Sequence, residues 1–265
     1  MNILIVGGAN GIGRLATRRL VAGGNRVVVA DRDVAALAAL ASAHGDVVTV
    51  AMDMVVRQSV ADALRTVADT VGALDAVVIS AGVHHTYPIE FVPDQLIDRV
   101  LDVNLTSHIK LVRDVLPLIR DGGRIVGLSS VSAGIGIPME GVYAASKAGL
   151  ERIYEALSIE ASYRRIRPVL IQPGNVNTGF NETGNDYTPR GVPYLDDGYA
   201  RVLNATDSAL GIDPEEVVNA IVKAIRVARP PVRYIVGTNA AKAHWANRLL
   251  GVDMALKVMA KLFGF

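Results

Sequence analysis

Short apolar runs rich in β-branched residues alternate with longer segments that mix apolar and polar positions along most of the chain. The short runs are typical of buried strands and lie at residues 2–6, 26–30, 46–50, 75–79, 124–128, 168–172 and 233–237. Helix-length segments separate them, at residues 14–22, 34–43, 59–71, 94–118, 143–163 and 214–227. Because alternating strands and helices are joined by right-handed crossovers, we predict an α/β fold: a doubly wound parallel sheet of about seven strands with helices on both faces.

Two regions depart from this rhythm. Residues 178–212 mix Gly, Asn, Asp, Thr and Pro with Tyr187, Tyr194 and Tyr199, a composition typical of a functional lid or a disordered segment. Residues 238–265 are apolar and basic, with Lys242, Arg248, Lys257 and Lys261 against a single Asp253. We therefore predict one domain at residues 1–237, with a weakly structured lid at 178–212, and a C-terminal helical extension at 238–265.

Composition excludes several classes of function. The 27 basic residues nearly balance the 26 acidic ones, so no global field attracts nucleic acid, and a small molecule is the expected partner. The absence of cysteine excludes disulfides, thiolate zinc sites and cysteine nucleophiles, and it suits a reducing compartment. The first residues form neither a signal peptide nor a membrane span, which predicts a cytoplasmic location. No ligand cluster accompanies His84 and His85, so we predict no metal and place both at a pocket mouth.

A glycine-rich turn follows the first predicted strand and opens the first helix, with Gly7, Gly11 and Gly13 in Gly-x3-Gly-x-Gly spacing. Such a turn lets main-chain N–H groups approach a pyrophosphate at a helix N-terminus, although tight strand-to-helix packing alone also requires glycine. Asp31 ends the second strand, where a carboxylate binds an adenosine ribose or caps the helix near residue 34. The carboxylate favours NAD(H), while Arg32 beside it leaves NADP(H) open.

Several motifs occur in an order that resembles the short-chain dehydrogenase/reductase family, in its single-domain branch. They are the glycine turn, Asp53, the Ser-Ala-Gly at 80–82, Asn104, Ser130, the Tyr-x3-Lys pair Tyr143 and Lys147, and the segment 173–178. The resemblance extends from the glycine turn to about residue 225 and implies a Rossmann-type fold. It also implies a homodimer or homotetramer that pairs the helices near 94–118 and 143–163.

The resemblance implies a catalytic set of four residues: Tyr143 as general acid/base, Lys147 as its partner, Ser130 as the substrate-orienting hydroxyl and Asn104 as a relay member. On a helix, Tyr143 and Lys147 share a face, so the ammonium is expected to lower the pKa of the phenol. Ser130 in a turn or cap, and Asn104 in a helix kink, are the structural alternatives.

The resemblance also implies a cofactor-binding set. In it, Asp53 contacts adenine, unless it is only a turn residue, while Thr178 and the backbone near Val176 bind the nicotinamide carboxamide. The set comprises Gly7, Asn10, Gly11, Ile12, Gly13, Asp31, Arg32, Asp53, Met54, Ser80, Ala81, Gly82, Tyr143, Lys147, Pro173, Gly174, Val176 and Thr178. Val6 and Ser80 depart from the threonine and asparagine usual in the family, which removes hydrogen-bonding groups near the glycine turn and predicts an altered cofactor affinity.

These observations predict an NAD(P)-dependent oxidoreductase, with NAD preferred, that transfers hydride between the nicotinamide and an alcohol or ketone carbon. The tail resembles extensions of family members that act on steroids and retinoids, which favours a lipophilic secondary alcohol or ketone. The tail covers the pocket, packs between subunits or, least favoured because its polar face is not clean, rests on a membrane. A 3-oxoacyl thioester reductase and a non-catalytic dinucleotide-binding regulator are the alternatives; a nucleotide-sugar epimerase or dehydratase fits the glycine spacing poorly.

Overall fold

The structure, a computed structural model, describes residues 1–180, 184, 187–205, 207, 211–238, 240–242, 245, 249 and 251–263, without the side chain of Tyr194. A seven-stranded sheet forms its centre, with strand order β3-β2-β1-β4-β5-β6-β7 and every neighbouring pair parallel. The strands are β1 Asn2–Val6, β2 Arg26–Asp31, β3 Val48–Ala51, β4 Leu74–Ile79, β5 Ile119–Leu128, β6 Arg167–Pro173 and β7 Arg233–Val236. The predicted doubly wound parallel sheet of about seven strands is confirmed.

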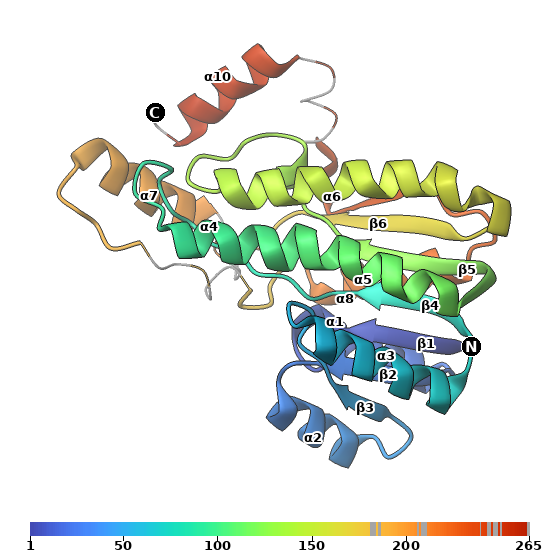
Figure 1. Cartoon of the computed structure of the whole chain (residues 1–265). Helices are drawn as coiled ribbons and strands as arrows, with labels where there is room; N and C mark the ends of the chain where they lie inside the picture. The colour runs from blue at the N-terminus through green and yellow to red at the C-terminus, as the bar shows by residue number, and fades with distance from the viewer. Residues whose placement is uncertain are drawn as a thin grey trace.

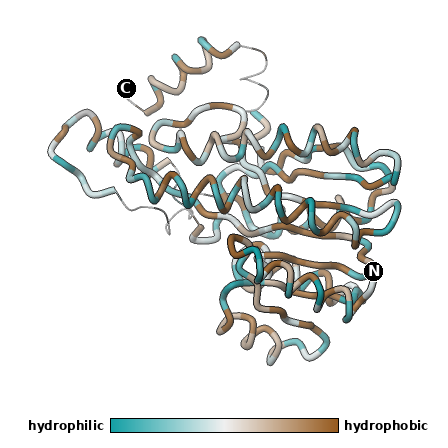
Figure 2. The backbone as a smooth tube through the Cα atoms, in the orientation of Figure 1, coloured by the Kyte–Doolittle hydropathy of each residue, from teal (hydrophilic) through white to brown (hydrophobic). Residues whose placement is uncertain are grey.

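Helices cover both faces of the sheet (Figure 1). One hydrophobic core joins alternate strand residues to α3 (Arg57–Val71), α5 (Ser107–Val115) and α6 (Gly141–Glu160). The second core joins the intervening strand residues to α1 (Gly11–Ala22), α2 (Val34–Ala43) and α8 (Pro214–Arg226). Because both faces are buried, the strands are continuous apolar runs, and Figure 2 shows them among the most hydrophobic stretches of the chain.

The strand order places the topological switch point between β1 and β4. From β1 the chain builds outward to β2 and β3, and then returns to add β4 on the other side of β1. In open α/β sheets, ligands bind at the carboxyl ends of the strands at such a point, because the connections on either side diverge and leave a crevice. The turn after β1 and the residues after β4 meet there.

The predicted helix at 94–118 is interrupted in the structure. It begins as α4 (Asp94–Leu101), passes through a π-helical turn at Asp102–Thr106, continues as α5 and ends in a 3₁₀ turn at Leu116–Leu118. Single π-helical turns inside α-helices are frequent at functional sites. Asn104 lies in this turn. The predicted helix therefore has the right extent, but it is not a continuous α-helix.

The expectation that residues 178–212 are weakly structured is wrong for Pro193–Ala205, which form helix α7. Pro193 opens the helix, where its fixed φ and missing N–H are tolerated. Leu195, Tyr199 and Val202 of α7 are buried in a third hydrophobic cluster. Their i, i+4, i+7 spacing was a helical signal that the Gly, Asp and Pro content obscured.

Part of the C-terminal extension is helical, as α10 at Val252–Phe263. In Figure 1 this helix lies beyond α6, on the side of the molecule away from β3, and contacts between α10 and α7 place the two helices together. Phe263 is buried in the same third cluster as Tyr199 and Val202. Among the described residues, no helix combines the length and the apolar character that a membrane crossing needs.

Candidate active site

A cavity of about 640 Å³ opens at the carboxyl ends of the central strands. Every residue of the predicted cofactor set lines it except Gly13, and Ser130 lines it as well. Asn104 is buried behind this lining. The motifs that are dispersed in the sequence therefore meet in one place, because each follows a strand whose carboxyl end points to the same edge of the sheet.

The glycine turn serves both packing and ligand approach. A Cβ atom at Gly13 would lie 1.9 Å from the main-chain oxygen of Gly7, so this glycine permits α1 to pack closely on the turn. Gly11, by contrast, has φ +50° and open space around its missing Cβ. Asn10 precedes α1 without a side-chain cap, which leaves the N–H groups of the first turn available to an anion at the cavity. The turn therefore fits a pyrophosphate.

Asp31 and Arg32 both lie at the cavity, at the end of β2. Asp31 accepts hydrogen bonds from the main-chain N–H groups of Ala9 (3.0 Å) and Asp33 (3.1 Å), which fix its carboxylate beside the glycine turn. The cap of α2 is Asp33, which accepts from Ala36 N–H at 2.9 Å. The capping alternative for Asp31 is therefore wrong, and its remaining acceptor capacity suits the hydroxyls of a ribose.

Asp53 is a turn residue at the cavity, and its predicted contact with adenine stays a prediction. Its carboxylate accepts a hydrogen bond from Val55 N–H at 3.0 Å, which makes it a turn residue, and it also lines the cavity. The departures at Val6 and Ser80 are accommodated by the backbone, because Ser80 N–H and Ala81 N–H donate to the main-chain oxygen of Val6 at 2.8 and 3.2 Å. Main-chain bonds thus connect the glycine turn to β4 without the side chains usual in the family.

Tyr143 and Lys147 lie one turn apart on α6, with the Lys147 Nζ atom 5.7 Å from the centre of the Tyr143 ring. Both are buried, and Lys147 donates a hydrogen bond to the main-chain oxygen of Leu128 at 2.8 Å. Burial lowers the pKa of Lys147 to about 8. Burial, and then the negative charge of Glu140, raise the pKa of Tyr143, while a hydrogen bond with Ser130 opposes them.

The expectation that Lys147 lowers the pKa of Tyr143 is therefore wrong for the protein without a bound cofactor. Burial disfavours the charged phenolate, and the Glu140 carboxylate repels it, so the pKa of Tyr143 rises although Lys147 lies on the same face of the helix. Ser130 adjoins Tyr143 as predicted and also caps the 3₁₀ turn at Val131–Ala133, where its Oγ atom accepts from Ser132 N–H at 3.2 Å. The capping alternative for Ser130 is therefore confirmed, and its role as the substrate-orienting hydroxyl stays a prediction.

Asn104 uses its side chain to hold the segment that follows β4. Its Oδ1 atom accepts from Val83 N–H at 2.8 Å, and its amide donates to the main-chain oxygen of Val83 at 2.8 Å and to Ser146 Oγ at 3.1 Å. The two amide protons are thus engaged within the protein. A relay role for Asn104 would rest on its main-chain carbonyl in the π-helical turn.

Glu140 and His84 are cavity residues whose importance the sequence did not reveal. His84 Nε2 lies 3.2 Å from Glu140 Oε1, and Ser132 Oγ donates to Glu140 Oε2 at 3.3 Å. The His84 ring meets the Tyr143 ring edge to face, with centroids 4.8 Å apart. A charged residue three positions before Tyr143, in an otherwise small and apolar stretch, was the available signal for Glu140. His84 lies at the cavity as expected, whereas His85 does not line it.

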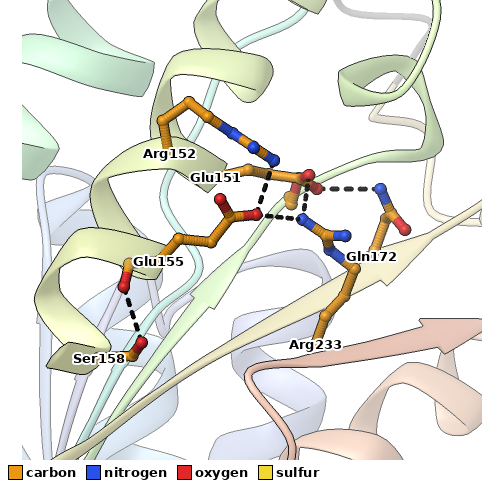
Figure 3. A network of polar contacts seen from close by, with 7 residues as sticks. Glu151, Arg152, Glu155, Ser158, Gln172 and Arg233 are labelled. Atoms are coloured by element: carbon orange, nitrogen blue, oxygen red, sulfur yellow. Dashed lines mark hydrogen bonds and ion pairs between the residues drawn. The ribbon is translucent and has the colours of Figure 1, made fainter.

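Glu151 of α6 is a second buried carboxylate, and its contacts join this helix to the sheet (Figure 3). It accepts hydrogen bonds from Ser129 of the segment after β5 (2.7 Å) and Gln172 of β6 (2.9 Å), and it forms an ion pair with Arg233 of β7 (2.5 Å). Arg233 also pairs with Glu155 at 3.2 Å. This network of Ser129, Glu151, Glu155, Gln172 and Arg233 connects α6 to the end of β5 and to strands β6 and β7.

The remaining wall of the cavity is largely apolar. It includes Ile137, Phe180, Met259, Leu262 and Phe263, three of which belong to α10. Tyr187 and Tyr199 do not line it: their rings pack together with centroids 5.0 Å apart, and the Tyr187 hydroxyl donates to Asp196 at 3.0 Å. These two tyrosines of the predicted lid therefore pack on each other instead of bordering the cavity, and the side chain of Tyr194 lies outside the described residues. Within the described part of the chain, no three His, Asp or Glu side chains gather as a metal site.

Comparison with known proteins agrees with this architecture. Residues 1–188 match the family described as short chain dehydrogenase. The chain is 28% identical to 3-ketodihydrosphingosine reductase of Bacteroides thetaiotaomicron over 241 residues, covering 89% of this chain and 87% of the relative. It is 34% identical to human retinol dehydrogenase 8 over 210 residues, covering 74% of this chain and 66% of that protein. It is 30% identical to rat retinol dehydrogenase 16 over 258 residues, covering 90% and 81%.

Solved structures share the fold. A short-chain dehydrogenase from Streptomyces avermitilis superposes with a TM-score of 0.84 at 24% identity, covering 98% of this chain and 96% of the other. A 3-ketoacyl-(acyl-carrier-protein) reductase from Brucella melitensis, complexed with NADH, superposes with a TM-score of 0.78 at 22% identity, covering 90% and 98%.

Proposed function

The chain belongs to the short-chain dehydrogenase family, whose members are oxidoreductases acting on CH–OH groups, and on that premise we propose that it interconverts a lipophilic secondary alcohol and its ketone with NAD(H). The observation that carries the proposal is the position of Tyr143 and Ser130, side by side at a cavity whose outer wall is apolar. The names of the relatives, retinol dehydrogenases and a ketosphingosine reductase, support a lipophilic substrate.

In the proposed mechanism, Ser130 orients the reacting oxygen and Tyr143 exchanges its proton. When bound, NAD(P) supplies or accepts the hydride. The raised pKa of Tyr143 keeps the phenol protonated, which suits a general acid that protonates the oxygen of a ketone. In the direction of alcohol oxidation the phenolate is required, so we expect this direction to be faster at alkaline pH. Lys147 donates a hydrogen bond to the main-chain oxygen of Leu128. Because its pKa is about 8, it also loses its positive charge at alkaline pH.

Tyr143→Phe tests the proposal. The variant is expected to lose turnover by roughly 10²–10⁴-fold, because it cannot transfer a proton, while cofactor binding survives. Tyr154→Phe is the matched control: Tyr154 is another buried tyrosine of α6, it bonds to His108 at 2.8 Å, and it does not line the cavity. If the biological activity of the protein survives in Tyr143→Phe although turnover is lost, the non-catalytic dinucleotide-binding regulator is supported instead. Turnover of acyl thioesters but not of free ketones would favour the 3-oxoacyl thioester reductase.

We propose NAD(H) over NADP(H) because the Asp31 carboxylate would repel a 2′-phosphate at the end of β2. Arg32 at the same edge of the cavity provides the opposing attraction. Comparison of kcat/KM for the two cofactors decides the question. A preference of more than about tenfold for NADPH, or about 1.4 kcal/mol, would contradict the role given to Asp31.

The C-terminal extension, on this proposal, covers the substrate end of the catalytic domain. The side chains of Met259, Leu262 and Phe263 at the cavity support this role over a contact with a membrane. A homodimer or homotetramer remains part of the proposal, supported by the exposure of Ile159 (76%) at the end of α6 and of Tyr163 (82%) in the 3₁₀ turn that follows. A monomer in light scattering at micromolar concentration would contradict it. The cytoplasmic location likewise stays a prediction, supported by the absence of cysteine.

A further inference from the structure

A small polar cluster interrupts the apolar wall of the cavity beside Tyr143. We propose that this cluster, His84, Glu140 and Ser132, is a second recognition point that binds a hydrogen-bond-donating group of the substrate, a hydroxyl or a protonated amine next to the reacting carbon. The inference rests on the proposed function, because it defines the substrate class of the same site.

The cluster is connected to the reacting centre by a short line of contacts. Ser130 Oγ donates to Ser132 Oγ at 3.2 Å, and Ser132 Oγ lies 3.3 Å from Glu140 Oε2. On the other side, the His84 ring packs edge to face against the Tyr143 ring. A substrate whose oxygen lies at Ser130 and Tyr143 would therefore bring the substituent on its neighbouring carbon toward Glu140 and His84.

His84 has hydrogen-bonding capacity that the protein does not use. Its side chain is only 2% exposed, yet within the described structure its Nδ1 atom has no hydrogen-bond partner. A buried polar atom without a partner costs about 1–3 kcal/mol, so such atoms at a cavity point to a ligand. Among the described residues, Glu140 forms an ion pair only with His84, so no lysine or arginine neutralises this carboxylate.

The backbone before α6 supports a functional role for Glu140. Met139, immediately before it, has φ 64°, in the left-handed region that non-glycine residues rarely adopt. Its main-chain oxygen is held by Tyr87 N–H at 2.7 Å. Conformations of this kind cost about 1–3 kcal/mol and cluster at active sites. Here the strained residue directs Glu140 to the cavity, where it is 3% exposed.

The chemistry of the cluster selects a donor. A carboxylate only accepts hydrogen bonds, and it attracts a cation. A substrate with a plain alkyl group at this position would place apolar surface against the Glu140 carboxylate and offer it no hydrogen-bond donor. Sites built to bind a polar group reject analogues that lack it by large factors, since their buried polar atoms remain unpaired.

The test uses three alcohols of one alkyl chain length: the plain secondary alcohol, the vicinal diol and the vicinal amino alcohol. Their oxidation is measured with the wild-type protein and with the variants Glu140→Gln and His84→Gln. Glu160→Gln is the matched control, because Glu160 is an exposed glutamate at the end of α6. The readout is the ratio of kcat/KM for each donor-bearing alcohol to kcat/KM for the plain alcohol. This ratio cancels a general loss of activity in a variant.

We expect the wild-type ratio to exceed ten for at least one of the two donor-bearing alcohols. Glu140→Gln should reduce that ratio at least tenfold if the donor is an amine, and by less if it is a hydroxyl, which a neutral amide still binds; Glu160→Gln should keep it. A wild-type ratio near one, or a ratio unchanged in both Glu140→Gln and His84→Gln, overturns the inference. If Glu140→Gln does not fold, as judged by circular dichroism, His84→Gln alone decides.

Failure of the proposed function gives a different result. In that case none of the three alcohols is oxidised with NAD or NADP. Calorimetric titration of the long-chain amino alcohol and diol into wild type and the two variants then tests the recognition point directly. Binding weakened at least tenfold by either variant supports the inference, and binding that is absent or indifferent to both overturns it.

Discussion

Two buried glutamates at one helix, Glu140 just before α6 and Glu151 within it, have opposite environments. Both residues are 3% exposed. Glu151 is surrounded by donors from the segment after β5 and from strands β6 and β7, including the Arg233 guanidinium. Glu140 has a histidine and a serine as partners and borders the cavity. The two carboxylates are equally buried, but only that of Glu151 is paired with an arginine.

The difference separates a structural carboxylate from one available to a ligand. Burial raises the pKa of Glu151, while Ser129 and Arg233 oppose that change and keep the network together. Glu140 instead acts on its neighbour, because its charge raises the pKa of Tyr143. A buried charge with a cationic partner holds elements together, whereas one that faces a cavity alters the chemistry there.

Lys147→Ala should produce the largest effect, because Lys147 lies on α6 between the two glutamates. We expect turnover to fall by roughly 10²-fold or more, through loss of the cation beside Tyr143. Lys223→Ala is the control, since Lys223 also lies over a tyrosine ring, that of Tyr234 at 5.6 Å, but away from the cavity. Equal kcat/KM in the two variants would remove any special role for Lys147.

Glu151→Ala should lower the free energy of unfolding by roughly 3 kcal/mol, because it leaves Ser129 and Gln172 buried without their shared acceptor and removes the buried partner of Arg233. Glu155→Ala, which removes the half-exposed partner of Arg233, should cost less than about 1 kcal/mol. Urea unfolding of both variants measures the difference. Similar losses would show that the network does not depend on its buried member.

His108 provides a third buried polar group, paired with Tyr154 of α6 at 2.8 Å. Burial, and secondarily Lys147, lower its pKa to about 3 from 6.5. The folded state therefore holds His108 neutral, while the unfolded chain binds a proton below pH 6.5, so stability falls as pH decreases from 6.5 toward 3. At pH 5 the loss is about 2 kcal/mol. Unfolding measured against pH should show this slope in the wild type and a shallower one in His108→Asn.

Glu140→Gln should have the smallest effect of the four, a change in pH dependence. Removal of the negative charge lowers the pKa of Tyr143. In the plot of kcat/KM for alcohol oxidation against pH, the rising limb should therefore move to lower pH. Glu160→Gln should leave the limb in place. A limb that stays fixed or moves to higher pH in Glu140→Gln would show that Glu140 does not influence the proton of Tyr143.

Much of the fold could be predicted from local patterns. The seven apolar runs became the seven strands within a few residues, because a strand buried on both faces must be apolar along its whole length. The position of most predicted cofactor residues at one cavity followed from the same pattern, since each comes just after a strand. Helix α7 was missed because its glycine and acidic residues outweighed its apolar spacing.

The sequence by itself determined the order of strands and helices, the family resemblance and the residues that meet at the sheet edge. Only the tertiary structure decided the environment of each side chain there. His84 and Glu140 are 56 residues apart, and no periodicity relates them. The direction of the Tyr143 pKa likewise depends on burial and on a charge outside the Tyr-x3-Lys spacing. Local patterns record which residues are apolar, whereas desolvation and Coulomb interactions depend on distances that exist only after the chain has folded.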